Sequence, residues 1–200
     1  MTTYENLKTC RNTILEMMHD RGYDISEFYD NKQNINQLTL NEIKSSYLEN
    51  NLKILVKKQE NDVCILFYND KIGIEMMKEI INSKMKKEKF HHLILIIREK
   101  LTSFAKKELN NIPPKCQIEV FLQHNILFNA THHVKVPKHE LIIDNDTHKN
   151  ILEIYGKATL PKISKHDVIS RYYNAKIGDI FKIYRHNTIF YRQVINDIDK

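Results

Sequence analysis

The chain has 200 residues, of which 42% are hydrophobic and 28% are charged, and this composition excludes an intrinsically disordered protein. Its longest apolar runs, Val63 to Tyr68 and Leu93 to Ile97, fall far short of the roughly 18 residues that a membrane-spanning helix needs, so we expect no membrane contact. The first twenty residues carry charges at helical spacing, which excludes a secretory signal peptide.

The formal net charge is +6, and its two parts are unequal. Residues 1–132 hold 19 basic and 17 acidic side chains, which gives +2, whereas residues 133–200 hold 12 and 8, which gives +4. Such a balance permits contact with nucleic acid or with acidic protein surfaces. The three cysteines are odd in number and widely spaced among apolar neighbours, which favours buried reduced thiols in a reducing compartment over a disulfide framework.

The first elements in chain order are two predicted helices. Leu7, Cys10, Ile14 and Met17 recur at helical spacing, so we predict an amphipathic helix over residues 4–20 that ends at Gly22. Arg11, Glu16 and Asp20 lie off that stripe and are expected on the solvent side. After a polar stretch, the apolar residues from Leu40 to Leu48 predict a second, shorter helix.

Strands and helices then alternate. Two β-rich runs, residues 52–57 and 63–68, predict a hairpin, and residues 93–97 and 117–122 predict two further strands. Between them we expect one helix along Ile74, Met77, Ile81 and Met85, and another over residues 103–111 that is capped by Thr102. We therefore predict an α/β (α+β) domain over residues 1–132, with a mixed sheet covered by helices.

Residues 133–200 predict a second, small mixed α/β domain. We expect a helix over residues 147–155 ended by Gly156, an extended connection over residues 160–163, and a short helix that Asp167 caps. Gly178-Asp179 then turns the chain into a hairpin of residues 180–184 and 189–195 around His186-Asn187. A domain of this size is near the lower limit for independent stability.

The histidine-rich stretch HNILFNATHHVKVPKH, residues 124–139, raises the question of a metal site. Adjacent His132 and His133 point to opposite faces of a strand, and His124 and His139 are distant in sequence, so this spacing does not favour zinc. The chain also lacks GxSxG, GxxxxGK and GxGxxG motifs, so we expect no nucleophilic centre, no phosphate loop, no metal and no cofactor.

A metal-dependent nuclease is the alternative that the alternating helices and strands leave open. Its carboxylates and lysine would come from Asp62, Asp70-Lys71 and Glu119, although Glu119 lacks a lysine two residues later. Lys84, Lys86, Lys87 and Lys89 gather at a predicted helix end, where a phosphate-contacting patch and an ordinary solvated terminus are both possible. Tyr172-Tyr173 and Phe190-Tyr191 lie within apolar patterns, which favours core or interface roles over base stacking.

Several motifs, in order, resemble one known family. These are His19-Asp20-Arg21-Gly22-Tyr23, Ile112-Pro113-Pro114, residues 129–133 with 136–139, Leu160-Pro161-Lys162-Ile163, Asp167, Arg171-Tyr172, Lys176, Gly178, Lys182-Ile183, Arg185 and Tyr191-Arg192-Gln193-Val194. They are similar to the shared fifth subunit of eukaryotic nuclear RNA polymerases, whose C-terminal part corresponds to a small, separate subunit of the archaeal polymerase. The match runs almost end to end.

The resemblance implies an N-terminal jaw domain of nuclease-like topology without known activity, and a C-terminal assembly domain. The assembly domain would dock on the largest polymerase subunit, near the shared sixth subunit, and the jaw would lie beside downstream duplex DNA, which it contacts without sequence specificity. The chain would then be a non-catalytic subunit that needs no self-association. The histidine-rich stretch would serve as an interdomain strand and linker.

Nine residues match the assembly domain's motifs and become the predicted interface: Pro161, Ile163, Asp167, Arg171, Tyr172, Gly178, Arg185, Tyr191 and Arg192. The three arginines are suited to bidentate pairing with carboxylates of a partner subunit. Some of the nine would also hold the small domain together. Pro161 would fix an extended connection, Asp167 would cap a helix, and Gly178 would supply a turn.

Two positions depart from the family pattern. Val168 stands where proline is usual, and the hairpin between Arg185 and Tyr191 is shorter than in cellular relatives. Together with the composition rich in Asn, Ile and Lys, these departures suggest a viral or otherwise divergent homologue. It would work in the host cytoplasm or the virion if viral, and in the nucleus if cellular. A competitor of host polymerase assembly is a further alternative.

Overall fold

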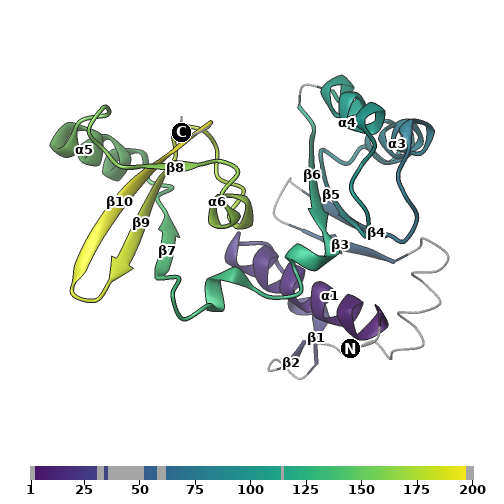
Figure 1. The fold of residues 1–200 in the computed structure, drawn as a ribbon, viewed down its shortest axis with the longest axis horizontal. Coiled ribbons are helices and arrows are strands. Elements are labelled where there is room, and N and C mark those ends of the chain that lie inside the picture. Colours follow the sequence, from purple (N-terminus) through teal and green to yellow (C-terminus); the bar gives the residue numbers. More distant parts are fainter. Residues whose placement is uncertain (1–2, 31–33, 36–51, 58–61, 114, 197–200) are drawn as a thin grey trace. The chain divides into compact units, whose positions relative to one another are not determined.

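The computed structural model describes residues 3–30, 34–35, 52–57, 62–113 and 115–196 (Figure 1). They form two compact units that divide between Phe128 and Asn129, whereas we predicted the boundary between His132 and His133. Each unit has a four-stranded mixed sheet, and the predicted α+β class is confirmed. The helix predicted around Leu40 to Leu48 lies outside the described residues. Among those that are described, no helix has the length and apolar character of a membrane span.

The N-terminal unit follows the predicted order of elements. Its main helices and strands are α1 (Thr3–Asp20), β3 (Lys53–Val56), β4 (Val63–Tyr68), α3 (Ile74–Ile80), the π-helix η2 (Ile81–Lys87), β5 (His92–Ile97), α4 (Ser103–Glu108) and β6 (Gln117–Leu122). Short segments complete it: η1 (Ser26–Phe28), β1 (Tyr29–Asp30), β2 (Asn34–Ile35), η3 (Leu109–Asn111) and η4 (Gln123–Asn125). Thr102 caps α4 as predicted, with its hydroxyl accepting from the Ala105 amide.

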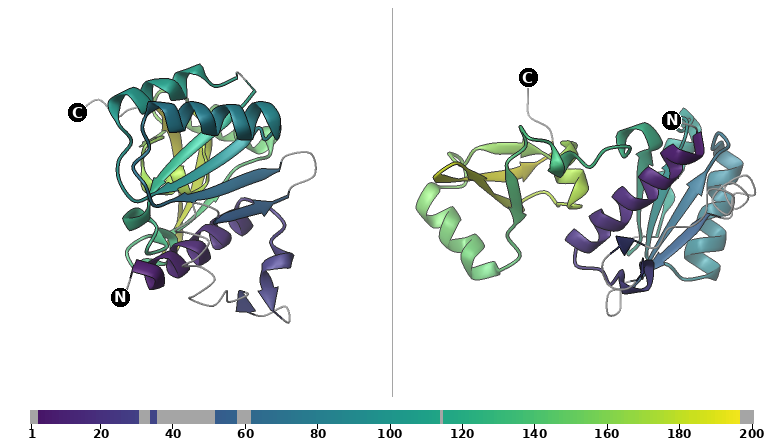
Figure 2. Two further views of the ribbon diagram at one scale, coloured as in Figure 1. Left: turned by 90° about the vertical axis from the view of Figure 1, so that its right-hand side faces the viewer. Right: turned by 90° about the horizontal axis from the view of Figure 1, so that it is seen from below.

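The sheet of this unit has the order β3-β4-β5-β6. The predicted hairpin is confirmed, because β3 and β4 are antiparallel, whereas β4, β5 and β6 run parallel. Strands β4 and β5 are apolar at nearly every position and therefore need cover on both faces. Helix α1 lies along one face, and α3, η2 and α4 lie along the other (Figure 2).

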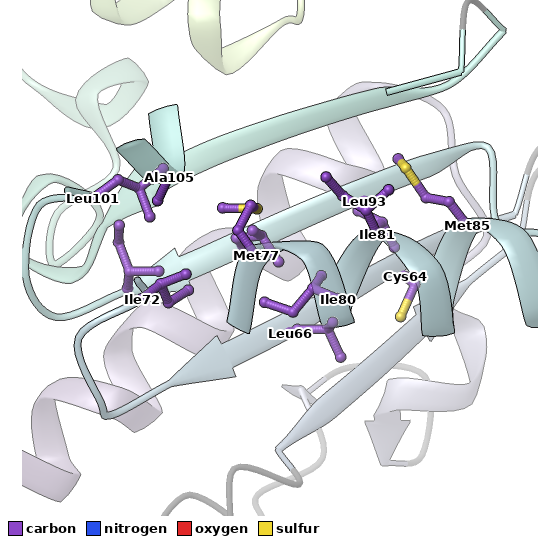
Figure 3. Close-up of a cluster of buried hydrophobic side chains, with 12 residues drawn as sticks. Cys64, Leu66, Ile72, Met77, Ile80, Ile81, Met85, Leu93, Leu101 and Ala105 are labelled. Carbon is purple, nitrogen blue, oxygen red and sulfur yellow. The ribbon is translucent and has the colours of Figure 1, made fainter. Parts of the chain in front are cut away.

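The core beneath α3, η2 and α4 joins alternate residues of β4 and β5 to the apolar stripe of those helices (Figure 3). Cys64, Leu66, Leu93 and Leu95 are on this face, and Met77, Ile80, Ile81 and Met85 lie over them. Ile74, which we predicted on the same stripe, is 36% exposed. The helix changes from α to π at Ile81, so the spacing of 3.6 residues per turn that we assumed does not hold over the whole segment. The prediction is therefore wrong for Ile74, the first residue of the stripe.

On the opposite face, a buried cluster of charges ties the end of α1 to β6. Arg21 binds Glu119 through two parallel hydrogen bonds, Nη1 to Oε1 at 2.8 Å and Nη2 to Oε2 at 2.9 Å. His92 Nε2 lies 2.7 Å from Glu119 Oε1, and it donates because an ionised carboxylate only accepts. The Arg21 and Glu119 side chains are only 4% and 11% exposed. Arg21 and His92 therefore satisfy the Glu119 carboxylate within the fold.

Arg11 corrects the expectation for α1. We predicted it on the solvent side, but it is 5% exposed, and its guanidinium lies 5.9 Å from the centre of the Phe28 ring. The segment after α1 thus covers part of the helix face that we expected to be exposed to solvent. Leu7, Cys10 and Ile14 are buried as predicted.

The C-terminal unit is built on the sheet β7-β9-β10-β8. Its elements are η5 (Ala130–His132), β7 (Lys138–Leu141), α5 (Asn145–Tyr155), β8 (Lys162–Ser164), α6 (Val168–Tyr172), β9 (Ile180–Arg185) and β10 (Thr188–Ile195). The hairpin around His186-Asn187, the Asp167 cap and the helix end at Gly156 are confirmed. The extended connection is corrected, because residues 162–164 form an edge strand parallel to β10.

We predict that Glu119→Gln lowers the free energy of unfolding by about 3 kcal/mol, since it leaves the buried Arg21 guanidinium without its counter-charge. Urea denaturation of both proteins measures this loss. The matched control is Glu88→Gln. Glu88 pairs at the surface with Lys53 and Lys84, so its loss should cost less than about 1 kcal/mol. Equal losses in the two variants would contradict a structural role for the buried cluster.

A pH dependence follows from the same cluster. Burial alone would raise the pKa of Glu119, but the hydrogen bond from His92 and the charge and hydrogen bonds of Arg21 outweigh it and lower the pKa to about 2 from 4.5. The stabilisation is therefore complete above pH 4.5 and is lost as the pH falls toward 2. The difference in unfolding free energy between wild type and Glu119→Gln should shrink over this range. If the difference in unfolding free energy stays constant down to pH 2.5, about half a unit above the lowered pKa, Glu119 does not have the lowered pKa in the folded protein.

Candidate subunit interface

The sheet of the C-terminal unit has two faces, and a different helix packs on each of them. Ile163, Phe181, Ile183 and Val194 pack with Ile169 of α6 on one face, which we call the α6 face. On the other, the α5 face, Ile180 and Tyr191 pack with Ile151 of α5 and with Leu160. The β-strand register assigns every residue of β9 and β10 to one of these faces.

Four of the nine predicted interface residues hold this unit together. Ile163 and Tyr172 are buried, at 5% and 6% exposure, and the Tyr172 hydroxyl accepts a hydrogen bond of 3.2 Å from Asn129 Nδ2. Asp167 caps α6, since its Oδ1 accepts from the Ile169 amide at 2.9 Å. Gly178 has φ +100, in the left-handed region that favours glycine. Its carbonyl also accepts from His148 Nε2 at 3.0 Å.

Arg185 and Arg192 share the α6 face. Arg192 is opposite Phe181 in the register, and Arg185 is two residues beyond Ile183 on β9, so their side chains project to the same side. Both guanidinium charges, and the carboxylate of Asp167, act on half-buried His139 of β7. Burial lowers the pKa of His139, the hydrogen bond to Pro137 and the charge of Asp167 oppose that shift, and the two arginines add to it.

Two exposed apolar residues belong to this face and its covering helix, and one of them contacts Arg185. Phe190 is opposite Ile183 and so lies on the α6 face, where it is 48% exposed, and the Arg185 Cζ lies 5.7 Å from its ring centre. Val168, at the start of α6, is 53% exposed. Sequence reasoning grouped Phe190 with Tyr191. The alternation of β10 was the signal that would have separated them, because it pairs Phe190 with Arg192 on one face.

The remaining three predicted residues have other surroundings. Tyr191 belongs to the α5 face, with its ring 5.6 Å from that of Tyr155. Pro161 is exposed, and its carbonyl accepts from the Gln193 amide at 2.8 Å beside the edge strand β8. Arg171 comes from α6 itself and is half-buried. The three arginines thus belong to the α6 face and its covering helix, whereas Tyr191 does not.

The histidine-rich stretch makes separate local contacts. His139 Nδ1 donates to the Pro137 carbonyl at 2.7 Å, and His133 Nδ1 accepts from the Lys135 amide at 3.1 Å. The described residues contain no group of three His, Cys, Asp or Glu side chains placed to hold a metal ion. Buried Asn129, at the start of the C-terminal unit, was missed as a structural residue. It bonds Tyr172 and accepts from the Thr131 amide at 3.0 Å.

The nuclease candidates are not brought together. Asp62 precedes β4 and Asp70 follows it, so they are separated by the length of the strand, roughly 20 Å. Lys71 is exposed beside Asp70. Glu119 is held by Arg21 and His92 under α1. This arrangement does not provide the paired carboxylates that a nuclease centre at this sheet would need.

Comparison with known proteins gives matches over both units. Residues 4–85 match the N-terminal domain of RNA polymerase Rpb5, and residues 128–195 match its C-terminal domain. Subunit RPABC1 of DNA-directed RNA polymerases I, II and III from Caenorhabditis briggsae is 29% identical over 184 residues, which cover 88% of this chain and 86% of that protein. The corresponding Dictyostelium discoideum subunit is 28% identical over 195 residues, 92% of each chain.

A third relative, the Arabidopsis thaliana DNA-directed RNA polymerase subunit 5-like protein 1, is 29% identical over 186 residues, or 88% of this chain and 86% of its own length. The N-terminal match lies in the first compact unit, and the C-terminal match lies in the second except for its first residue, Phe128. The chain therefore belongs to the Rpb5 family, the fifth, shared and non-catalytic subunit of DNA-directed RNA polymerases.

Proposed function

We propose that the C-terminal unit is an assembly domain that docks on the largest polymerase subunit, near the sixth shared subunit, and that the N-terminal unit is a jaw beside downstream duplex DNA. The family assignment supports the first part, as does the α6 face with its two arginines and exposed Phe190. The relatives come from eukaryotes, and those from Caenorhabditis briggsae and Dictyostelium discoideum are named for polymerases I, II and III, which favours the nucleus as the compartment.

The α6 face carries this proposal because its composition is that of a protein interface. Arginine and aromatic residues are enriched among the side chains that dominate binding energy, and a guanidinium can pair with a carboxylate through two hydrogen bonds. Arg185, Arg192 and Phe190 stand on rigid antiparallel strands joined by a two-residue turn. Little conformational freedom of the backbone would be lost when this face docks.

We predict that the double variant Arg185→Glu/Arg192→Glu reduces recovery of the largest subunit with the tagged protein at least about tenfold. The reason is that the new carboxylates would face the carboxylates of the partner subunit with which the arginines are proposed to pair. Quantitative mass spectrometry after affinity purification measures the ratio. The matched control is Lys149→Glu/Lys157→Glu, which makes the same change of charge at exposed positions on and just after α5. Undiminished recovery with the arginine variant, or an equal loss with the control, would contradict the assigned face.

For the jaw, the proposed DNA contact is a strand-end patch of exposed basic residues that follows β5: Arg98, Lys100, Lys106 and Lys107. None of them forms an ion pair with a described carboxylate. Lys107 Nζ lies 5.8 Å from the ring centre of Phe104, which is 65% exposed. Uncompensated cations at one end of a sheet suit non-specific contact with phosphates.

We predict that Lys106→Glu/Lys107→Glu weakens retention on a duplex and lowers the magnitude of its log-log salt slope by roughly 1 to 2, because each lost phosphate contact releases about one counterion fewer. A titration of fluorescent duplex at several salt concentrations provides both numbers. The Lys149→Glu/Lys157→Glu protein should keep the wild-type slope. A slope that changes equally in both variants would indicate net charge alone and would contradict the patch.

A further inference from the structure

A second basic region lies at the other end of the N-terminal sheet, around a hollow of about 520 Å³. The three apolar residues that line it are Met85, Pro113 and Cys116, which we call its floor. The four polar residues that line it are Lys86, Lys89, His91 and Lys115, which we call its rim. We call this feature the basic hollow. Its volume is within the range of pockets that take small ligands or single side chains.

The fold holds the walls of the basic hollow in place. The π-helix η2 ends with the Glu88 amide donating to the Ser83 carbonyl at 3.0 Å, and Lys89 then has φ +59, in the left-handed region. The Gln117 amide donates to the His91 carbonyl at 2.7 Å, which joins the start of β6 to the start of β5. The Cys116 amide closes the opposite wall by donating to the Pro113 carbonyl at 2.8 Å.

The charge of the rim is not neutralised within the described residues. Glu88, the acidic neighbour in sequence, already pairs with Lys53 and Lys84. Lys86, Lys89 and Lys115 make no ion pair with any carboxylate that the structure describes. Three uncompensated lysines around one concavity create a positive potential that favours an anionic ligand.

This region is separate from the strand-end patch. His91 and Cys116 precede the parallel strands β5 and β6, whereas Arg98 follows β5, so the two basic regions lie at opposite ends of strands that are roughly 20 Å long. Figure 3 shows Met85 at the opposite end of the core from Leu101 and Ala105. A ligand of the hollow therefore does not need to be the duplex that the strand-end patch is proposed to bind.

The apolar floor decides which anion fits. A duplex presents phosphates on a wide rigid surface and has no group that would enter the hollow and cover Met85, Pro113 and Cys116. An acidic peptide has both parts, because its carboxylates can meet the lysines while one apolar side chain fills the centre. We infer that the basic hollow is a docking site for an acidic segment of a partner protein that inserts one large apolar side chain.

The test uses the full chain and a short fluorescein-labelled peptide of Asp and Glu residues with one central Phe. Fluorescence anisotropy should show saturable binding that weakens at least about fivefold when Phe is replaced by Ser, and that disappears when the acidic residues are replaced by Asn and Gln. The variant Lys86→Glu/Lys89→Glu should weaken binding about tenfold, since two attractive contacts become repulsive. The controls Lys106→Glu/Lys107→Glu and Lys149→Glu/Lys157→Glu should bind as the wild type does.

Cys116 provides an independent readout on the unmodified protein. Cys10 and Cys64 are fully buried, and burial raises the pKa of their thiols to about 12 and about 11, so a thiol reagent should react first with half-buried Cys116. Bound peptide should slow labelling of Cys116 at least about fivefold at saturating peptide, because binding sites exclude the reagent in proportion to their occupancy.

Three results would overturn the inference. The first is that the peptide with Phe shows no saturable binding. The second is that its affinity is unchanged in Lys86→Glu/Lys89→Glu. The third is that Cys116 is labelled at the same rate with and without bound peptide. Duplex binding that is lost in Lys86→Glu/Lys89→Glu and kept in Lys106→Glu/Lys107→Glu would instead make the hollow a nucleic-acid contact. Failure of the strand-end patch in its own salt titration leaves these peptide results unaffected, so the two proposals can fail separately.

Discussion

Burial of both faces of the N-terminal sheet is the constraint on which the jaw depends. Val63, Ile65, Phe67, Ile94 and Ile96 are fully buried on the face that also carries Glu119, while Cys64, Leu93 and Leu95 are buried on the other. The central strands β4 and β5 therefore have no free face for a ligand. The groups that can meet a partner lie at the strand ends, on the edge strand β3 and on the surfaces of the covering helices. The strand-end patch and the basic hollow lie in these positions.

The same constraint explains why Glu119 is a structural residue. Its position in β6 is opposite Ile94, so its side chain enters the layer beneath α1. A carboxylate there is tolerated only when hydrogen bonds and an opposite charge compensate for lost hydration, and Arg21 and His92 supply both. The motif around Arg21 thus joins the helix to the sheet. In the C-terminal unit, motif residues such as Asp167 and Gly178 similarly maintain the frame that presents Arg185, Arg192 and Phe190.

Local patterns predicted most of the described elements, because their signals are local. The apolar stripe from Leu7 to Met17, the cap at Thr102 and the hairpin at His186-Asn187 each depend on a few neighbouring residues. What failed depends on distant parts of the chain. Burial of Arg11 depends on Phe28, and the pairing of residues 162–164 depends on β10, about thirty positions later. The hollow could not be predicted either, since Lys86 and Lys115 are brought together only by the strand pairing.

The π-helical turn at Ile81–Lys87 has a consequence for how this family member can change over evolution. A π turn accommodates one more residue than an α turn does, so deleting a single residue there would let the backbone return to the more common helix. Because the π turn absorbs the extra residue, the side chains that follow the deletion would keep their orientation around the helix axis. A deletion from an α-helical segment such as Ile74–Ile80 would instead turn every later side chain of the helix by about 100°. The segment Ile81–Lys87 is therefore the part of this helix where a change of one residue in length disturbs the core least.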